Sequence, residues 1–563
     1  MTATELYRTA IPMLFATALL LAGCGGGGGS SSGGGGDPAP TPPPQDPQFR
    51  VSGLTPFAVG CNGIGRNGTL YASAEVEPSV AVNPQDATNL IGVWQQDRWS
   101  NGGARGLLTG VSFDGGRTWS TKSAAFSRCT GGTADNGGDY DRASDPWVTF
   151  APDGTAYQIA IVFNGENFTA GAVNAVLVSR TIDRGLTWSN PVTLIRDGSD
   201  FFNDKESITA DSTDARYAYA VWDRLSAAGS GPTWLARTMD GGKTWEAARL
   251  IYDPGPGNQT INNQIVVLPD GALVNFFTRI ANAANGTAST SLVIIRSQDK
   301  GLTWSAPIVI AALQALGTRD PEAGTPIRDG ATLGSIAAGR NGMLAVAWQD
   351  SRFSAGARDG IAFSRSTDGG LTWSAPVRVN SVPNAQAFIP AVNVRSDGTI
   401  GVTYYDLRNN TNDPTTLPTD YWLARSTDGV NWIETHVSGP FDFAIAPNAG
   451  GLFLGDYQAL ISIGSVFVPF YVQTNTGNTS NRTDVFASPL NSAATAAAKS
   501  AATELQPGQS RGGVSLHAEP TPPLVSTPEL AQRLTESVTR TMERRVRGWT
   551  PRGILRAIAA DPR

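Results

Sequence analysis

Apolar and polar residues alternate in short runs along most of the chain. Clear examples are residues 79–98, 208–224 and 392–408, each of which holds two apolar runs on either side of a polar turn. Alternation with a period of two predicts antiparallel strands with one buried face, and the turns between them predict hairpins. The pattern therefore predicts an all-β fold.

A nine-residue sequence, here called the tryptophan box, recurs between these strand pairs. It begins with Ser or Thr, has an Asp two positions later and a Trp near its end, as in SFDGGRTWS and STDGGLTWS; a sixth copy is shortened to STDGVNW. The six copies begin at Ser112, Thr181, Thr238, Ser297, Ser366 and Ser426. A turn Asp accepts backbone N–H bonds, Gly permits a positive φ, and Trp buries a large ring. We therefore assign the box a structural role and no chemistry.

The spacing of the boxes predicts the architecture. They follow one another at intervals of 57 to 69 residues, and each interval holds four predicted strands. Four antiparallel strands at this period predict a β-propeller blade. Residues 457–488 fit a seventh repeat that lacks its box and outer strand, and residues 49–59 have strand character without a blade of their own. We therefore predict a seven-bladed propeller over residues 49–490, closed by the N-terminal strand; six blades with one irregular repeat is the alternative.

The six boxes resemble the BNR or Asp-box repeats of the sialidase-like β-propeller family, over about residues 77–490. The resemblance implies an exo-sialidase-type glycoside hydrolase that removes terminal anionic sugars. Such enzymes bind the substrate carboxylate with three arginines and use a tyrosine nucleophile, a glutamate that activates it, and an aspartate as acid/base. This chain lacks the Arg-Ile-Pro motif of the family, because Glu77-Pro78-Ser79 begins its first inner strand.

Candidate site residues follow from position, since the blade ends opposite the boxes surround the expected ligand site. The candidate catalytic residues are Asp145 as the acid, Tyr405 or Tyr457 as the nucleophile and Glu206 as its activator. The candidate anion-binding residues are Arg98, Arg224, Arg352 and Arg408. A guanidinium fork suits this task because it binds carboxylates bidentately. Alternatively, each recurring Asp–Arg pair is a salt bridge that locks a blade rim to its neighbour.

Two functions stay open, a glycosidase and a non-catalytic propeller that binds glycans or proteins. The formal charge of −6 over 563 residues argues against a nucleic-acid surface. Only two histidines, His436 and His517, are present, so histidine-based zinc sites and Ser-His-Asp chemistry are nearly excluded. We expect no cofactor and no metal, a glycan or glycoconjugate as the partner, and a monomer.

The N-terminus is expected to be a lipoprotein signal peptide over residues 1–23. A short apolar run follows Arg8 and ends in Leu21-Ala22-Gly23-Cys24, which resembles a bacterial lipobox and implies lipidation of Cys24. Residues 24–48 are rich in Gly, Ser and Pro and form a tether. We therefore expect a lipid-anchored protein outside the cytoplasm; an ordinary secretory signal is the alternative.

The two remaining cysteines, Cys61 and Cys129, fall in same-face loops of adjacent predicted blades. An exported protein can pair such cysteines, so we predict a Cys61–Cys129 disulfide. Asp135, Asp139 and Asp141 lie near Cys129, but their spacing matches no calcium-binding loop, and a solvated acidic loop is expected.

Residues beyond 490 leave the propeller. Residues 491–526 have a linker composition, and residues 527–563 form a basic helical tail that starts at Thr527-Pro528-Glu529. The helix carries an apolar stripe of Leu530, Leu534, Val538 and Met542 and a cluster of arginines near its end. We expect it to pack loosely on the propeller or stay mobile; contact with lipids or a partner is the alternative.

Overall fold

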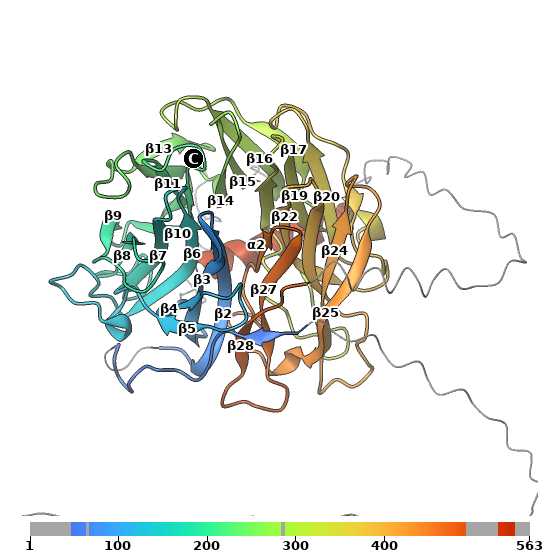
Figure 1. Ribbon diagram of the computed structural model, residues 1–563. Coiled ribbons are helices and arrows are strands. Elements are labelled where there is room, and N and C mark those ends of the chain that lie inside the picture. Colours follow the sequence, from blue (N-terminus) through green and yellow to red (C-terminus); the bar gives the residue numbers. More distant parts are fainter. Residues whose placement is uncertain (1–46, 63–66, 283–287, 491–526, 547–563) are drawn as a thin grey trace, which may run out of the picture. The chain divides into compact units, whose positions relative to one another are not determined.

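The computed structural model describes residues 47–62, 67–282, 288–490 and 527–546. The predicted signal peptide, the lipidated Cys24, nearly all of the tether and the linker lie outside the described residues. The rest is built almost wholly from antiparallel strands, which confirms the predicted all-β propeller (Figure 1).

The described strands form five four-stranded sheets and one eight-stranded sheet, whose two halves are joined by the single pair Ala104–Ala143. Divided at that pair, the strands make seven units of four. The first contains β2 (Leu70–Asn83), β3 (Asp86–Trp99), β4 (Ala104–Ser112) and β5 (Ser120–Lys122). The second contains β6 (Arg142–Phe150), β7 (Ala156–Asn164), β8 (Val173–Thr181) and β9 (Val192–Asp197). The third contains β10 (Phe201–Ala210), β11 (Ala218–Ser226), β12 (Thr233–Thr238) and β13 (Arg249–Tyr252). The fourth contains β14 (Gln259–Val267), β15 (Leu273–Asn282), β16 (Ala288–Ser297) and β17 (Ile308–Ala312).

The remaining units repeat the same order. The fifth contains β18 (Gly334–Ala338), β19 (Leu344–Asp350), β20 (Gly360–Ser366) and β21 (Val377–Arg378). The sixth contains β22 (Ala387–Val394), β23 (Ile400–Asp406), β24 (Pro418–Ser426) and β25 (Ile433–Asp442). The seventh contains β26 (Ala459–Ile463), β27 (Val466–Thr474), β28 (Thr483–Ala487) and β1 (Phe49–Arg50). Single-turn 3₁₀ helices lie at Arg128–Thr130, Arg352–Ser354 and Phe443–Ile445, and the α-helix α2 spans Pro528–Val546.

The units close into a ring. The first strand of each unit contacts the first strand of the next, and these contacts join β2 with β6, β6 with β10, β10 with β14, β14 with β18, β18 with β22, β22 with β26, and β26 with β2. The N-terminal strand supplies the outer edge of the last unit, because Phe49 pairs with Ala487 and Arg50 with Phe486. Residues from the two ends of the propeller thus share one sheet, which leaves the ring no open seam.

The box turns are held by their own side chains. In the third unit, the Asp240 carboxylate accepts bonds from the Lys243 N–H at 3.0 Å, the Thr244 N–H at 2.9 Å and the Thr244 hydroxyl at 2.6 Å. These hydrogen bonds, led by the one from the Thr244 hydroxyl, lower the pKa of Asp240 to about 2. The Trp rings of other boxes donate to a glycine carbonyl of the same turn, as Trp119 does to Gly116 at 2.9 Å.

Replacing Asp240 with alanine should therefore affect stability and leave the rest of the molecule unchanged. The substitution removes four hydrogen bonds from a solvent-exposed turn, including one from the Thr238 hydroxyl at 2.9 Å, and a loss of about 1 kcal/mol of unfolding free energy is expected. Urea denaturation measures this loss. A loss of ligand binding in the folded variant would contradict the structural role of the box.

The boxes and the Asp–Arg segments occupy opposite ends of the blades. Between β3 and β4, Leu90 pairs with the box residue Ser112, whereas Arg98 pairs with Ala104 at the other end. The third unit repeats this arrangement, with Ala218 opposite Thr238 and Asp223 opposite Thr233. The end opposite the boxes is therefore available for a ligand.

A disulfide joins two loop regions at the end of the blades opposite the boxes. The sulfur atoms of Cys61 and Cys129 form a disulfide. The acidic loop after Cys129 is neutralised by one cation, because Arg128 pairs with both Asp139 and Asp141. Within the described residues, no helix is both long and apolar enough to cross a membrane.

Candidate functional site

Five of the innermost strands carry the same irregularity. Their pairing slips by one residue at a bulge, at Glu77 in β2, Asp145 in β6, Lys205 in β10, Asn262 in β14 and Ile389 in β22. Each of these residues has a positive φ, between 51° and 66°. A bulge turns the extra side chain away from the alternation of the strand. Four of the five bulge residues are polar or charged, so the bulges bring polar groups together near the ring axis.

A cavity of about 210 Å³ lies at this end of the ring. Its walls come from several units, from the connection before β18, and from α2. The charged residues that line it are Arg98, Asp141, Arg142, Asp145, Glu166, Asp204, Lys205, Arg328, Asp456 and Arg545. The cavity therefore combines carboxylates with guanidinium groups in a small volume.

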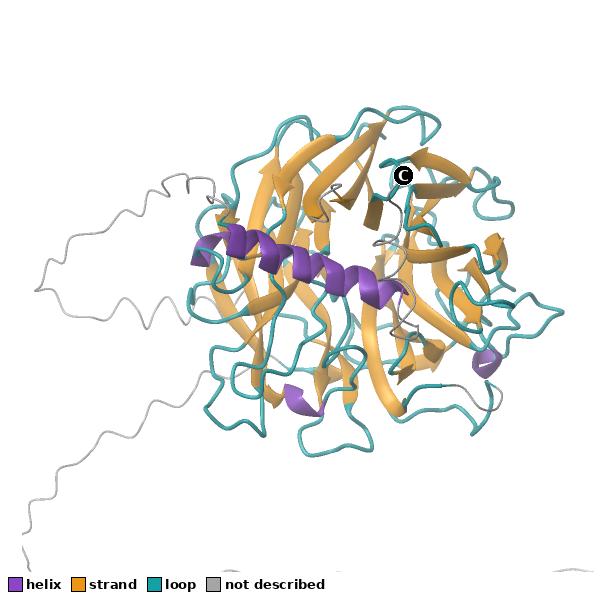
Figure 2. Ribbon diagram, turned by 180° about the vertical axis from the view of Figure 1, so that it is seen from behind, coloured by secondary structure: helices purple, strands orange, loops and turns teal. Residues whose placement is uncertain are grey.

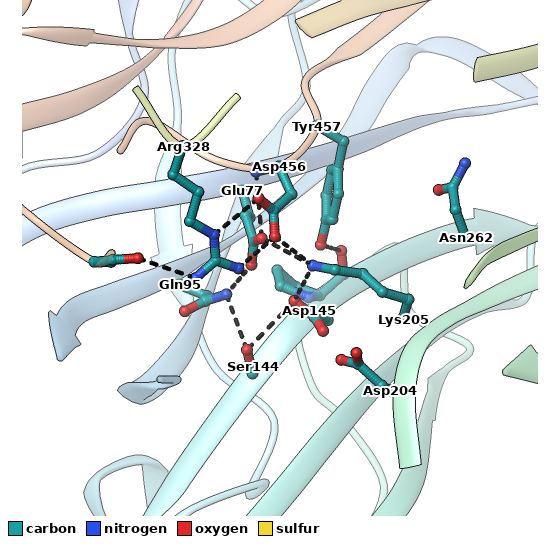
Figure 3. Close-up of polar contacts among 12 residues, drawn as sticks. Glu77, Gln95, Ser144, Asp145, Asp204, Lys205, Asn262, Arg328, Asp456 and Tyr457 are labelled. Carbon is teal, nitrogen blue, oxygen red and sulfur yellow. Dashed lines mark hydrogen bonds and ion pairs between the residues drawn. The ribbon is translucent and has the colours of Figure 1, made fainter. Parts of the chain in front are cut away.

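Lys205 holds the centre of the cluster. Its ammonium nitrogen lies 3.2 Å from Glu77, 3.1 Å from Asp145 and 2.8 Å from Asp456. Figure 3 shows the ammonium group pointing at these three carboxyl groups, which belong to three different units. The ammonium group is 8% exposed, so water screens these interactions little.

The carboxyl groups around Lys205 titrate differently. Burial raises the pKa of Glu77 to about 8, against the opposing influence of Lys205. Burial also disfavours ionisation of Asp145, but the Lys205 ammonium and a hydrogen bond from Glu77 bring the pKa of Asp145 below its usual value. At neutral pH the pair therefore holds one proton, which resides on Glu77 and is donated to the Asp145 carboxylate.

The third carboxylate, Asp456, is bound from two sides. Arg328 binds it bidentately, with its Nε 2.9 Å from Asp456 Oδ1 and its Nη2 on the other oxygen. Burial opposes ionisation, yet Arg328 and Lys205 together hold the pKa of Asp456 well below its usual value. Asp456 therefore stays charged and fixes both cations.

Two guanidinium groups share one aromatic ring beside this cluster. Arg98 lies 4.9 Å and Arg328 4.3 Å from the centroid of Phe453. Burial, together with the charge of Arg328, lowers the pKa of Arg98 to about 10. Arg98 Nε has no hydrogen-bond partner within the part of the chain that the structure describes. An anionic ligand in the cavity would supply that partner.

A chain of amide and hydroxyl groups links the guanidinium of Arg98 to the carboxyl pair. Arg98 donates to Gln95 Oε1 at 2.6 Å, and the Gln95 amide donates to Glu77 and to Ser144, the latter at 3.1 Å. Ser144 in turn donates to Asp145 at 3.3 Å. The orientation of every polar group in this chain is therefore fixed before a ligand enters.

Among the predicted site residues, Asp145 and Arg98 line the cavity. Tyr457 is close to the cluster, 5.6 Å from the Lys205 ammonium group, but its hydroxyl donates to the Pro146 carbonyl at 3.1 Å. Burial, with Glu77 as the next cause, raises the pKa of Tyr457 well above its usual value. Tyr457 is therefore held as a neutral phenol beside the cavity.

The predicted activator Glu206 is buried next to the cluster. Burial, and then the charge of Asp145, raises the pKa of Glu206 well above its usual value. Neither of its carboxyl oxygens has a hydrogen-bond partner among the described residues. Glu206 is not part of the cavity wall.

The other predicted residues are not brought to the cavity. Tyr405 lies in the apolar core, where its hydroxyl donates to the Val472 carbonyl at 2.6 Å. The three remaining arginines are engaged by carboxylates outside the cavity: Arg224 by Asp197, Arg352 by Asp350, and Arg408 by Asp406 and Glu434. The recurring pairs of Arg352 and Arg408 are salt bridges within one unit, and Arg224 pairs with Asp197 of the preceding unit and not with its neighbour Asp223. Of these three arginines, only Arg224 joins neighbouring units by an ion pair, as the salt-bridge alternative expects.

Two central residues were not among the candidates. Lys205 lies between Asp204 and Glu206, and strict alternation would point it away from the side that those two share. At the bulge, Lys205 lines the cavity together with Asp204, whereas Glu206 does not. Arg328 belongs to the long connection between β17 and β18, which is on the predicted ligand side of the ring. The position of Arg328 could therefore be predicted from the sequence, whereas the inward direction of Lys205 could not.

No group of three or more His, Cys, Asp or Glu side chains within the described ranges is arranged to hold a metal ion. Three carboxylates of the cavity, Asp145, Asp456 and Asp204, are bound instead by Lys205, Arg328 and Arg545, respectively.

No protein-family model matches the chain. Solved structures match it at low identity. The Hadza microbial sialidase Hz136 is 16% identical, with 72% of this chain and 75% of that chain covered and a TM-score of 0.40. The GH93 alpha-L-arabinofuranosidase of Fusarium graminearum is 13% identical, with 62% and 93% covered and a TM-score of 0.39. The Trypanosoma rangeli sialidase is 14% identical, with 69% and 57% covered and a TM-score of 0.37. Because these TM-scores are low, the chemistry of this chain has to come from its own side chains.

Proposed function

We propose that the cavity binds a terminal anionic sugar of a glycan and that the Asp145–Glu77 pair protonates the glycosidic oxygen. The chain would then be an exo-acting glycoside hydrolase of the sialidase type. The observation that carries this proposal is the pair itself, one carboxyl group protonated and the other ionised, with Asp145 at the cavity wall. Neighbouring titratable groups whose pKa values are driven apart are typical of acid/base sites.

The two members of the pair have different tasks. Glu77 lies behind Asp145, fully buried, and holds the proton; it passes the proton to the Asp145 carboxylate, which faces the cavity and delivers it to the glycosidic oxygen. Lys205 keeps both oxygens in place and balances the charge that forms after transfer. Glu77 is thus a positioning residue, and Asp145 is the candidate catalytic acid.

The guanidinium groups give the cavity its preference for anions. Arg98 has an unused Nε–H, and Arg328 adds a second positive charge on the same face of the cavity. A carboxylate on the sugar could accept hydrogen bonds from Arg98 without displacing an existing partner. This arrangement supports an acidic sugar over a neutral one.

One observation favours the second function, a glycan-binding propeller without catalysis. Tyr457, the candidate nucleophile nearest the cluster, donates its hydroxyl to a carbonyl and does not line the cavity. The same pocket would then recognise an acidic sugar without cleaving it. In either case, we propose that the protein is displayed outside the cytoplasm on a lipid anchor at Cys24, which the lipobox-like sequence supports.

Hydrolysis of fluorogenic glycosides tests the proposal. Turnover by the full chain is expected for 4-methylumbelliferyl sialoside or another acidic glycoside and not for the neutral galactoside. Asp145→Asn should lower kcat by about 10²–10⁴-fold. Arg98→Met should mainly raise KM, because it removes a contact with the sugar carboxylate.

Arg352→Met is the matched control, because it removes a half-buried arginine that has an Asp partner but lies outside the cavity. Arg352→Met should change neither kcat nor KM. Binding of acidic glycans without turnover, lost in Arg98→Met, would establish the glycan-binding function instead. Turnover that survives Asp145→Asn would refute the assignment of the acid.

A further inference from the structure

The C-terminal helix α2 lies across the ring (Figure 2). Its side chains reach three successive units. Arg533 donates to the Gly356 carbonyl of the fifth unit at 2.7 Å, and Arg540 donates to the Leu316 carbonyl in the connection before that unit at 2.8 Å. Between them, Val538 packs against apolar residues that include Ile261. The helix is therefore seated on the propeller and not merely near it.

The last described turn of α2 enters the cavity. Arg545 is 7% exposed, and its guanidinium group is bound by four acceptors of the propeller. The acceptors are Asp204 Oδ2 at 2.9 Å, Gln259 Oε1 at 2.8 Å, the Thr260 carbonyl at 3.3 Å, and Asp223 Oδ2. They come from three strands of two units, so the propeller supplies the complete acceptor set for a planar guanidinium fork.

Without α2, Asp223 has no positively charged partner from its own unit among the described residues. In the fifth and sixth units, the aspartate at the end of the second strand binds the arginine two residues later, as Asp350 binds Arg352. In the third unit the adjacent arginine, Arg224, turns to Asp197 instead. Asp223 is consequently left without a cation from its own unit, although it is fully buried. A buried carboxylate without a counter-charge is strongly unfavourable.

A second observation also points to a ligand. Asp223 Oδ1 is buried and has no hydrogen-bond partner within the described part of the chain, even with Arg545 in place. The site therefore offers more acceptor capacity than the helix uses. Arg545 and the neighbouring Thr541 are the residues of α2 that line the main cavity, which places this cation site next to the anion-binding residues Arg98 and Arg328.

We propose that Asp204, Asp223, Gln259 and the Thr260 carbonyl form a guanidinium-binding subsite of the cavity, which Arg545 occupies as an intramolecular ligand. α2 then controls access to the cavity, and its last turn must leave before a ligand can fill this subsite. An arginine-like guanidinium group is the external ligand that competes with Arg545. This inference does not depend on the proposed glycosidase activity.

The anchoring of α2 is consistent with movement of one end only. Leu530, near the start of the helix, covers Gly356, where an added Cβ would lie 2.6 Å from a Leu530 methyl carbon. Gly356 also has a φ of 77°, so both the backbone and the contact favour glycine. The first turns are thereby held at the fifth unit, while the last described turn depends on Arg545.

Methylguanidinium chloride, at millimolar concentrations far below those that denature proteins, tests the subsite by chemical rescue. In the full-length Arg545→Ala variant it should raise Tm by a few degrees in a saturable manner, because it binds only the folded state. The wild type should not respond, and Arg545→Ala/Asp223→Asn should not respond either. Arg533→Ala is the matched control, since it removes an arginine of α2 that lies outside the cavity, and it should behave like the wild type. Equal responses in all variants, or none in Arg545→Ala, would overturn the proposal.

Hydrogen exchange on the wild-type chain gives a second measurement that needs no variant. Methylguanidinium should accelerate amide exchange in the last described turn of α2 several-fold and leave the first turn unchanged. Methylammonium at the same ionic strength should have a smaller effect, because it lacks the planar fork. Uniform acceleration along the helix, or none, would contradict competition for the subsite.

Discussion

Replacing Glu77 with glutamine is expected to lower glycoside turnover at pH 7 by about 10²–10³-fold and to restore much of it in acid. In the wild type, the pair holds its proton until the pKa of Glu77, about 8, so activity should fall above that pH. In the Glu77→Gln variant, the ionised Asp145 carboxylate has no neighbouring carboxyl group that supplies a proton at neutral pH. Turnover then requires protonation of Asp145 itself, whose pKa lies below its usual value, so the alkaline limb of the pH–rate profile should move to acid pH.

Glu77 also predicts a pH dependence of stability that requires no substrate. The folded pKa of about 8 lies above the ordinary value of 4.5, so the folded state binds more protons than the unfolded state between these two values. The free energy of unfolding should therefore decrease as the pH rises from 4.5 to about 8, and it should stay constant at higher pH. Urea denaturation between pH 4.5 and pH 8.5 should show this slope in the wild type and a smaller one in Glu77→Gln.

Glu75→Gln is the matched control for both measurements. Glu75 lies in the same strand, is fully buried and has a pKa raised by burial, but its neighbours are Asp484, Asp97 and Gln96, from which it accepts a hydrogen bond, and not Asp145 or Lys205. Glu75→Gln should reduce the dependence of the free energy of unfolding on pH and leave the pH–rate profile unchanged. If Glu75→Gln shifts the profile as Glu77→Gln does, the proton is not stored by the pair proposed here.

The propeller could be predicted from the sequence because its signals are local and repeated. Each box contains the residues that form its turn, as in the third unit, where Asp240 is the acceptor and Trp245 the partly buried ring. The strands on either side keep a period of two. Closure by residues 49–59 followed from a strand without a blade, and the structure pairs Phe49 with the last unit. These features require no knowledge of distant contacts.

The centre of the site could not be predicted in the same way. A bulge formed by a residue other than glycine leaves no mark in the sequence, yet it reverses which side chains face the axis. Lys205 was therefore not predicted, while the next residue, Glu206, was expected at the site. Arg545 was noticed only as part of a basic tail, because its partners lie more than 280 residues away in the chain.

The bulges also show where the fold is strained. A non-glycine residue with a positive φ costs on the order of 1–3 kcal/mol, and the structure accepts this at Glu77, Asp145 and Lys205. The same bulge in the sixth unit carries Ile389, which packs in the apolar core. The bulge is therefore a property of the inner strand, and the identity of its residue decides whether a unit contributes to the polar cluster.

Lys205→Met should have the largest effect on stability, with a loss of about 3–5 kcal/mol at pH 7. The side chain is buried and binds three carboxyl groups, of which Asp145 has no other cation among its described salt bridges. Methionine keeps the length of the side chain, so the loss reflects charge more than volume. Because unpaired buried carboxylates take up protons, the variant should recover stability as the pH falls towards 5.

Two comparisons make this prediction specific. Lys300→Met removes an ammonium group that pairs with one buried carboxylate, Asp211, at 2.7 Å, but Lys300 is 28% exposed, and a loss of about 1 kcal/mol or less is expected.

The double variant Lys205→Met/Asp145→Asn also removes the carboxylate charge that Lys205→Met leaves unpaired, so it should be more stable than Lys205→Met at pH 7. If the double variant is less stable than the single one, the ammonium group does not act by neutralising Asp145. The cluster would then owe its order to Arg328 and Asp456, whose ion pair remains in both variants.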